Sequence, residues 1–229
     1  MTTSREKVLG DIRKALGKRA QRDEAANAAL EARLEAHEPG TIPKRAQKSA
    51  AEQCRLFIEI AREAAATVEE IKSLSDVPEA VADFLAAHNL SSEIVAAPDP
   101  ALKDVDWKSR ETLEVREGAA APADQTSVTA AFAGVAETGT LILTSGPSSP
   151  TTLNFMPDNH IVVLRADQIV GDYETMWAKL RQKANPEAAK VMPRAVNWIT
   201  GPSRSADIEQ KLLMGAHGPR RLHILVVQK

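Results

Sequence analysis

Short apolar runs alternate with longer amphipathic segments along most of the chain. The runs have the length of buried strands and are rich in Val and Ile, and they fall at residues 93–97, 161–164, 195–200 and 222–227. The segments between them place apolar side chains at helical spacing, at residues 44–66, 75–89 and 173–183. Alternation of strands and helices is typical of a layered α/β domain. We therefore predict a mostly parallel sheet with helices packed on it.

The middle of the chain contains a less regular stretch. Residues 127–136 are rich in alanine, and we predict a helix there that meets the turn at Glu137. A strand is expected to follow, up to Thr144. The loop at residues 145–150, which begins with Ser145, combines hydroxyl side chains with glycine and proline. Such a loop is suited to present backbone N–H groups and side-chain oxygens to a ligand.

The first 45 residues differ from the rest because they are charged, rich in alanine and followed by helix breakers. Thr3 and Glu6 have the spacing of a capping box, which starts a helix. Apolar side chains then recur at helical spacing, at Val8, Leu9, Ile12 and Leu16. We predict a helical arm at residues 1–45 and an α/β domain at residues 46–229. So narrow an apolar stripe serves either for packing on the chain's own domain or for contact with a partner or a second copy in a homo-oligomer.

A strand, a tight turn and a helix are predicted in succession near the C-terminus. The apolar run at 195–200 is followed by a Gly-Pro breaker. Ser203 or Ser205 then caps a helix, which Gly215 ends in a left-handed conformation. In open α/β sheets ligands bind beyond the carboxyl ends of strands, and residues 200–205 follow such an end. We therefore expect a small-molecule site at this turn.

Composition and charge narrow the possible functions. The net charge is −2 and aromatic residues make up 3% of the chain, so neither a basic field nor a stacking surface indicates nucleic-acid binding. The single cysteine, Cys54, is too few for an iron–sulfur cluster, and no spacing of His, Asp and Glu matches a metal site. Neither a signal-peptide pattern nor an apolar run of membrane-spanning length is found. We expect a cytoplasmic protein without membrane insertion and without a cofactor or metal of its own.

Carboxylate, hydroxyl and imidazole side chains near the predicted turns are the candidates for chemistry. Glu137 is placed to act as a general base or nucleophile, or alternatively to fix its turn by accepting backbone N–H bonds. His217, between small neighbours, either exchanges a proton near neutral pH or ties loop backbone together, whereas His160 opens a buried strand and is interpreted as structural. Arg204 and the hydroxyls beside it suit a ligand with a carboxylate, or serve only as a helix cap. The candidate ligand-binding residues are Thr138, Gly139, Thr140, Ser145, Gly201, Ser203, Arg204, Ser205 and Asp207.

Four motifs, in this order, carry a family resemblance. They are AETGT at residues 136–140, PDNHIVV at 157–163, GPSRSADIE at 201–209 and GAHGP at 215–219. Together they resemble the motifs of the LUD-domain family, and a weaker likeness covers nearly the whole chain. The resemblance implies an open, mostly parallel sheet with helices on both faces, as in the superfamily of sugar isomerases and CoA transferases.

The resemblance also implies a function. It places the chain in a bacterial system that oxidises L-lactate to pyruvate, as an accessory subunit that binds a small organic acid or sugar-like ligand. Iron–sulfur clusters are then expected in sister proteins, because this chain has one cysteine. The alternatives are a stand-alone isomerase or transferase that uses Glu137, and a structural assembly subunit that uses the N-terminal arm. Residues 137–139 and 201–209 are expected to face each other across one cleft.

Overall fold

The computed structural model describes residues 3–16, 24–183, 192–205 and 213–228. The chain divides into two compact units, Met1–Thr41 and Ile42–Lys229. The first unit contains the helices α1 (Ser4–Leu16) and α2 (Glu24–Ala36). The predicted capping box is present at the start of α1, where the Thr3 N–H donates to the Glu6 carboxylate at 2.8 Å and the Glu6 N–H donates to the Thr3 hydroxyl at 3.3 Å.

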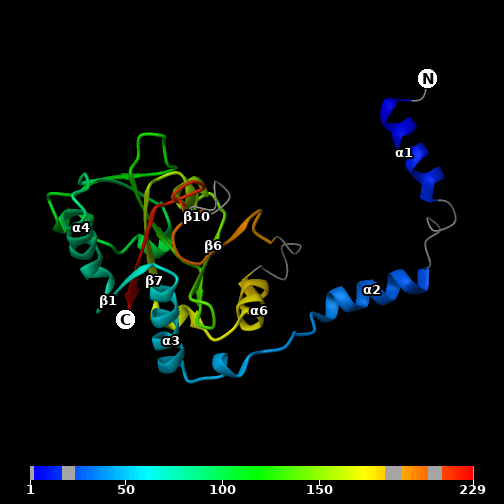
Figure 1. The fold of residues 1–229 in the computed structure, drawn as a ribbon, viewed down its shortest axis with the longest axis horizontal. Helices are drawn as coiled ribbons and strands as arrows, with labels where there is room; N and C mark the ends of the chain where they lie inside the picture. The colour runs from blue at the N-terminus through cyan, green and yellow to red at the C-terminus, as the bar shows by residue number, and fades with distance from the viewer. Residues whose placement is uncertain (1–2, 17–23, 184–191, 206–212, 229) are drawn as a thin grey trace. The chain divides into compact units, whose positions relative to one another are not determined.

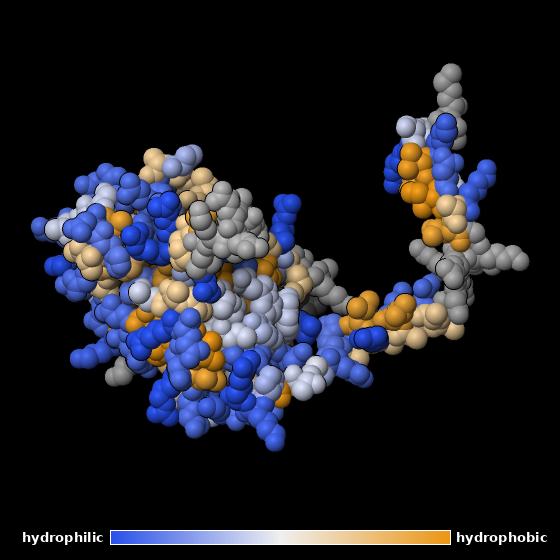
Figure 2. All heavy atoms as spheres, viewed as in Figure 1, coloured by the Kyte–Doolittle hydropathy of each residue, from blue (hydrophilic) through white to orange (hydrophobic). Residues whose placement is uncertain are grey.

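Apolar side chains line α1 without being buried. Val8, Ile12 and Leu16 are about half exposed, and no residue of this helix is buried. Figure 2 shows the apolar side chains gathered along α1. Because these residues recur every fourth position, they share one side of the helix. The stripe that the sequence predicts is therefore present, and the fold of the first unit does not cover it.

The second unit is organised around a six-stranded sheet (Figure 1). In spatial order its strands are β1 (Thr67–Ile71), β12 (Arg221–Val227), β7 (Asn159–Arg165), β4 (Thr126–Ala130), β2 (Glu93–Ala96) and β3 (Glu114–Glu117). Every neighbouring pair in this sheet is parallel. The helices of this unit are α3 (Ala50–Glu63), α4 (Val77–Ala87), α5 (Thr152–Phe155) and α6 (Tyr173–Lys183). The predicted α/β architecture with a mostly parallel sheet is confirmed.

Alternate residues of the central strand β7 pack against different layers. Ile161 and Val163 belong to an apolar cluster that includes Phe84 of α4. Val162 and Leu164 belong to another cluster, built with side chains of α3. Since successive residues of a strand point to opposite faces, α3 and α4 cover opposite faces of the sheet, as the resemblance implies. Cover on both faces explains why β7 reads as a continuous apolar run rather than an alternating one.

A second sheet packs on the same face as α3. Its strands, in spatial order, are β8 (Ile169–Val170), β5 (Ala133–Val135), β6 (Thr140–Thr144) and β9 (Val196–Ile199). β6 runs antiparallel to both β5 and β9, and its Leu141 and Leu143 pack in the α3 cluster. β10 (Arg204–Ser205) and β11 (Leu213–Met214) form a separate antiparallel pair. Short 3₁₀ turns lie at Lys44–Ala46, Leu74–Asp76, Pro100–Leu102, Trp107–Ser109 and Ala166–Gln168.

The prediction of an alanine-rich helix before Glu137 is wrong. The strands β4 and β5 occupy this stretch. Val128 and Thr129 are buried in the middle of the six-stranded sheet, where β-branched side chains pack well on a pleated surface. Burial in a central strand overrides the helix propensity of the alanines, which is a weak preference.

The helix predicted after residue 203 is also wrong where the structure describes it. Arg204 and Ser205 pair with Met214 and Leu213, respectively, as antiparallel strands. The segment between them, residues 206–212, lies outside the described residues, and so does the candidate Asp207. A hydroxyl residue after a Gly-Pro pair is as compatible with a turn into a strand as with a helix cap, because Ser favours both.

Candidate functional site

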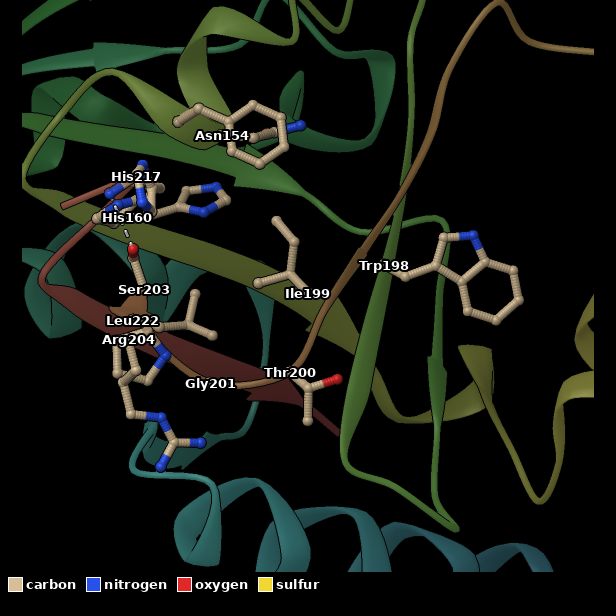
Figure 3. A pocket seen from close by; sticks show the side chains of 14 residues that line it. Asn154, His160, Trp198, Ile199, Thr200, Gly201, Ser203, Arg204, His217 and Leu222 are labelled. Atoms are coloured by element: carbon tan, nitrogen blue, oxygen red, sulfur yellow. Dashed lines mark hydrogen bonds between the residues drawn. The ribbon is translucent and has the colours of Figure 1, made fainter. Parts of the chain in front are cut away.

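A cavity of about 240 Å³ lies between the central sheet and the end of β9 (Figure 3). Its lining residues are Asn154, Phe155, His160, residues 198–204, residues 217–219 and Leu222. A cavity is therefore present at the turn after residue 200, where the sequence predicts a small-molecule site. The prediction rests on ligand binding beyond the carboxyl ends of parallel strands, and that arrangement is not found here. β9 is antiparallel to its neighbour, and β7 and β12 border the cavity near their amino ends.

One wall of the cavity is the turn that begins at Gly201. Its φ of 72° lies in the left-handed region, which glycine adopts without a steric penalty. A Cβ at this position would lie 2.0 Å from the carbonyl oxygen of Ala64, just after α3. Only glycine permits this approach, so the contact fixes the position of the wall against the helix.

Ser203 joins this wall to the loop that carries His217. The Ser203 hydroxyl accepts a hydrogen bond from the His217 N–H at 3.2 Å. The Ser203 N–H donates to the Pro219 carbonyl at 2.9 Å, and the Ser203 carbonyl accepts from the Gly215 N–H at 3.0 Å. The predicted helix cap is thus replaced by a bridge between two loops. Gly215 has the predicted left-handed conformation, with φ of 79°, but in a turn that follows β11.

The described residues of the lining include cationic and imidazole groups and no carboxylate. Arg204 and His217 are exposed residues of this lining. Phe155, which is 45% exposed, and the buried Leu222 add apolar surface. The Trp198 indole instead packs against Tyr173 and Trp177 of α6, with ring centroids 4.8 and 5.2 Å apart, and Figure 3 shows it apart from the other lining side chains. A guanidinium binds a carboxylate through charge-assisted hydrogen bonds, and the apolar surface accommodates a methyl or methylene group. The combination suits a small carboxylic acid.

His160 is the most buried polar residue of the lining. Its side chain has an exposure of 0%, and its Nε2 lies 2.8 Å from the Thr129 hydroxyl. Its Nδ1 is buried and has no hydrogen-bond partner among the residues described. Burial lowers the pKa of His160 from 6.5 to about 3, because desolvation disfavours the charged imidazolium. The imidazole is therefore neutral at physiological pH.

Glu137 does not belong to this lining. Its side chain is buried, and its carboxylate accepts a hydrogen bond from the Tyr173 N–H at 3.3 Å. Its own N–H donates to the Gly171 carbonyl at 3.1 Å. The carboxylate thus holds the β5–β6 turn to the start of α6, which is the structural alternative given by the sequence. A role for Glu137 in catalysis stays a prediction that the cavity does not support.

Hydroxyl groups connect the Glu137 turn to the cavity. The Thr138 hydroxyl lies 2.7 Å from the Tyr173 hydroxyl, and the Thr140 hydroxyl lies 2.7 Å from that of Thr200. Gly139 is left-handed, with φ of 61°, and a Cβ there would lie 2.5 Å from the Ala61 nitrogen. Of these residues only Thr200 lines the cavity. The 137–139 segment therefore supports the wall from behind, and the expected cleft between the two segments is not what the structure shows.

The remaining candidates lie elsewhere. Ser145 exchanges hydrogen bonds with Ala195, since its hydroxyl accepts from the Ala195 N–H at 2.8 Å and its N–H donates to the Ala195 carbonyl at 2.9 Å. It borders a wider hollow of about 800 Å³ together with Pro150 and Arg194. Ser205 is buried in β10 and is not part of the cavity lining. These two positions therefore have separate local roles.

Sequence reasoning missed one whole side of the cavity. Asn154 and Phe155 come from the short helix α5, which precedes β7, and Asn154 is only 5% exposed. The sequence pattern marks His160 as structural because it opens a buried strand. The motif at residues 157–163 held the available signal, since a polar residue inside an otherwise apolar strand is unusual and needs a partner.

Three further findings concern metal ligation, the single cysteine and the helices. Within the part of the chain that the structure describes, no group of three His, Cys, Asp or Glu side chains is placed to hold a metal ion. Burial raises the pKa of the Cys54 thiol, so the thiolate is disfavoured. The described helices also include none with the length and apolarity needed to cross a membrane.

Comparison with known proteins identifies the family. The model of the LUD domain matches residues 54–227, which include every lining residue of the cavity. The chain belongs to the LUD-domain family. Lactate utilization protein C of Geobacillus sp. (strain WCH70) is 36% identical over 107 residues, which cover 46% of this chain and 44% of that LUD protein. The match thus spans about half the length of this curated relative.

Two other relatives extend the LUD comparison. The uncharacterized protein YkgG of Escherichia coli (strain K12) is 29% identical over 188 residues, or 77% of this chain and 80% of the relative. A crystal structure of a DUF162 family protein from Deinococcus radiodurans matches with a TM-score of 0.55 and 26% identity. That likeness covers 79% of this chain and 99% of the other chain, so nearly the whole of the solved protein shares the LUD fold described above.

Proposed function

We propose that this LUD protein is an accessory component of a bacterial system that oxidises L-lactate to pyruvate, and that its cavity binds a short 2-hydroxy or 2-oxo acid. The relatives named lactate utilization protein C support the pathway. The observation that carries the ligand class is Arg204 beside apolar surface, with no carboxylate among the described lining residues. A stand-alone isomerase or transferase activity is the alternative function, and it has a separate test below.

The size of the cavity favours a small metabolite. Its volume of about 240 Å³ is below the roughly 300–1,000 Å³ typical of sites for drug-sized ligands. Arg204 supplies the positive charge for a carboxylate, and His217 is exposed nearby with its N–H held by Ser203. Phe155 and Leu222 offer apolar area for the rest of the molecule. A three-carbon acid matches this division into one charged and one apolar side.

The proposal assigns electron transfer to partner proteins. Oxidation of lactate to pyruvate releases an electron pair, which iron–sulfur clusters accept one electron at a time. A cluster held by cysteine thiolates takes about four of them, and this sequence has one, Cys54. Its thiolate form is disfavoured by burial, which raises its pKa. Sister proteins that carry clusters are therefore the proposed partners.

Isothermal titration of the purified chain with L-lactate and pyruvate tests the ligand assignment. Replacing Arg204 by Gln removes a charge-assisted hydrogen bond, so the dissociation constant of either acid should rise roughly 10- to 100-fold. Arg55→Gln is the matched control, because Arg55 is exposed on α3 and outside the lining, and its affinity should equal that of the wild type. Absence of binding to the wild-type chain, or equal effects of the two substitutions, would refute the assignment.

The accessory role has its own test. The chain alone, mixed with L-lactate and an artificial electron acceptor, should produce no pyruvate. Addition of cluster-bearing sister proteins should restore the reaction, and the Arg204→Gln chain should restore it less well at low lactate. Turnover by the isolated chain would show instead that it is an enzyme in its own right. A Glu137→Gln variant of that active chain would then reveal whether the carboxylate takes part.

A further inference from the structure

We propose that His160 is the group that recognises the oxygen atom at C2 of the bound acid, and so makes the cavity selective for 2-hydroxy and 2-oxo acids over simple carboxylic acids. The inference rests on the proposed function, since it names a contact within the same cavity. It assigns a role to a residue that the sequence pattern alone marks as structural.

The first observation is an unsatisfied polar atom at the cavity. The Nδ1 atom of His160 is buried and finds no hydrogen-bond partner in the described residues, although the same ring lines the cavity. The opposite ring nitrogen, Nε2, lies 2.8 Å from the Thr129 hydroxyl. Buried polar groups in native proteins nearly always have a partner, and a ligand supplies one when the protein does not. Of the side-chain atoms without a partner in the described residues, Nδ1 of His160 belongs to a residue of the cavity lining, and we assign it as the atom that bonds to the ligand.

The second observation is the direction of the strand face. His160 is in register with Leu222 of β12, and paired residues of neighbouring parallel strands point to the same side of a sheet. Leu222 packs in the α3 cluster and also lines the cavity. The His160 ring therefore lies on the face that carries β9 and Gly201. Figure 3 shows His160 and His217 at one end of the cavity.

The charge state decides which part of the ligand His160 contacts. Burial lowers the pKa of His160 to about 3, so the ring is neutral at physiological pH. A neutral imidazole is a poor partner for a carboxylate. Arg204, on the same cavity, supplies the partner for that anion. The neutral ring is suited to an uncharged oxygen. In this proposal Arg204 binds the carboxylate of the acid, and His160 binds its C2 oxygen.

The Thr129 hydroxyl allows His160 to bind either oxidation state. A hydroxyl both donates and accepts, so Nε2 can be the donor or the acceptor in its 2.8 Å bond with Thr129. When Nε2 carries the proton, Nδ1 accepts a hydrogen bond from the C2 hydroxyl of lactate. When Thr129 donates, Nδ1 carries the proton and donates to the C2 carbonyl of pyruvate. The ring changes tautomer, and no charge is created.

A second histidine provides a matched control. His223 is also buried, and its Nδ1 lies 2.8 Å from the Thr67 hydroxyl. Its Nε2 has no hydrogen-bond partner in the described residues and lies 3.7 Å from a carboxylate oxygen of Glu69. It packs against Phe84 of α4, with ring centroids 4.6 Å apart, on the opposite face of the sheet, and does not line the cavity. Substitution of His223 therefore has a similar effect on the interior without touching the site.

The test compares L-lactate with propionate, which has the same carbon chain and carboxylate but no oxygen at C2. Wild-type protein should bind L-lactate about tenfold more tightly than propionate, as one hydrogen bond implies. In His160→Phe the ratio of the two dissociation constants should fall to about one, with propionate affinity little changed. In His223→Phe the ratio should stay at the wild-type value.

The outcomes separate the two proposals. Wild-type protein that binds neither L-lactate nor pyruvate refutes the proposed function. Protein that binds L-lactate, but with the same lactate-to-propionate ratio in His160→Phe as in the wild type, leaves that function intact and refutes the role of His160. Should His160→Phe fail to fold, ¹⁵N NMR of wild-type histidine rings replaces it. Titration with L-lactate should then shift the Nδ1 resonance of His160 and leave His223 unchanged, whereas equal shifts with propionate would overturn the assignment.

Discussion

Substitution of Gly201 by Ala gives the sharpest test of how the cavity wall is held. The added Cβ would lie 2.0 Å from the Ala64 carbonyl oxygen and 3.1 Å from the carbonyl carbon. Because these are backbone atoms, a change of side-chain rotamer cannot relieve the clash. Gly201 also has φ of 72°, a conformation that costs a non-glycine residue roughly 1–2 kcal/mol. Overpacking against fixed atoms adds about 1–3 kcal/mol. We expect the free energy of unfolding to fall by roughly 2–5 kcal/mol.

Urea denaturation measures this loss directly, and calorimetry should show a melting temperature about 4–20 °C lower, given roughly 2–4 °C per kcal/mol for a domain of this size. Binding of L-lactate should weaken in the same variant because the wall must shift. The control is Gly146→Ala, where an added Cβ meets no atom within 4 Å and the change should stay within about 0.5 kcal/mol. Equal stability of the two variants would show that the wall is not held against α3.

Three other substitutions test the rest of the structure. His160 and His223 have pKa values lowered by burial from 6.5 to about 3 and about 4, respectively, so unfolding takes up protons as the pH falls below 6.5 and stability is lost in that direction. At about pH 5 each histidine should remove roughly 2 kcal/mol relative to about pH 7.5. Urea denaturation of His223→Phe should show about half of the combined loss, and an unchanged loss would contradict the assignment. Tyr173→Phe removes the hydroxyl that lies 2.7 Å from Thr138 and should lower the unfolding free energy by about 1 kcal/mol, measured by calorimetry; no change would argue against this bond. Glu137→Gln keeps an oxygen acceptor for the Tyr173 N–H, so titration should show lactate affinity equal to the wild type, and lost binding in a folded variant would bring Glu137 back into the site.

The strands and helices with strong periodicity could be predicted from the sequence. β7 and β12 are unbroken apolar runs because both faces of the parallel sheet are covered. α3 repeats Phe57, Ile58 and Ala61 on one side, which is a clear helical pattern. The alanines near β5 misled the prediction, because propensity is local whereas burial of Val128 and Thr129 depends on strands distant in sequence.

The site could be predicted on one side only. The Gly-Pro turn and the loop around His217 contain turn residues, which mark a site locally in the sequence. The opposite side of the cavity is different, because His160 reaches it through pairing of β7 with β12 and Asn154 lies on α5, just before β7. The antiparallel direction of β9 is likewise fixed by its pairing with β6, which composition does not encode. Contacts over long sequence separation thus account for what the sequence left out.

The end of α3 has a consequence for engineering the cavity. Gly139 meets the backbone of Ala61, and Gly201 meets that of Ala64, so a single helical turn sets the position of two glycine turns. The helix backbone therefore sets how closely the cavity wall approaches α3. A library that varies positions 139 and 201 would therefore shift the wall relative to α3 while leaving the other lining side chains intact.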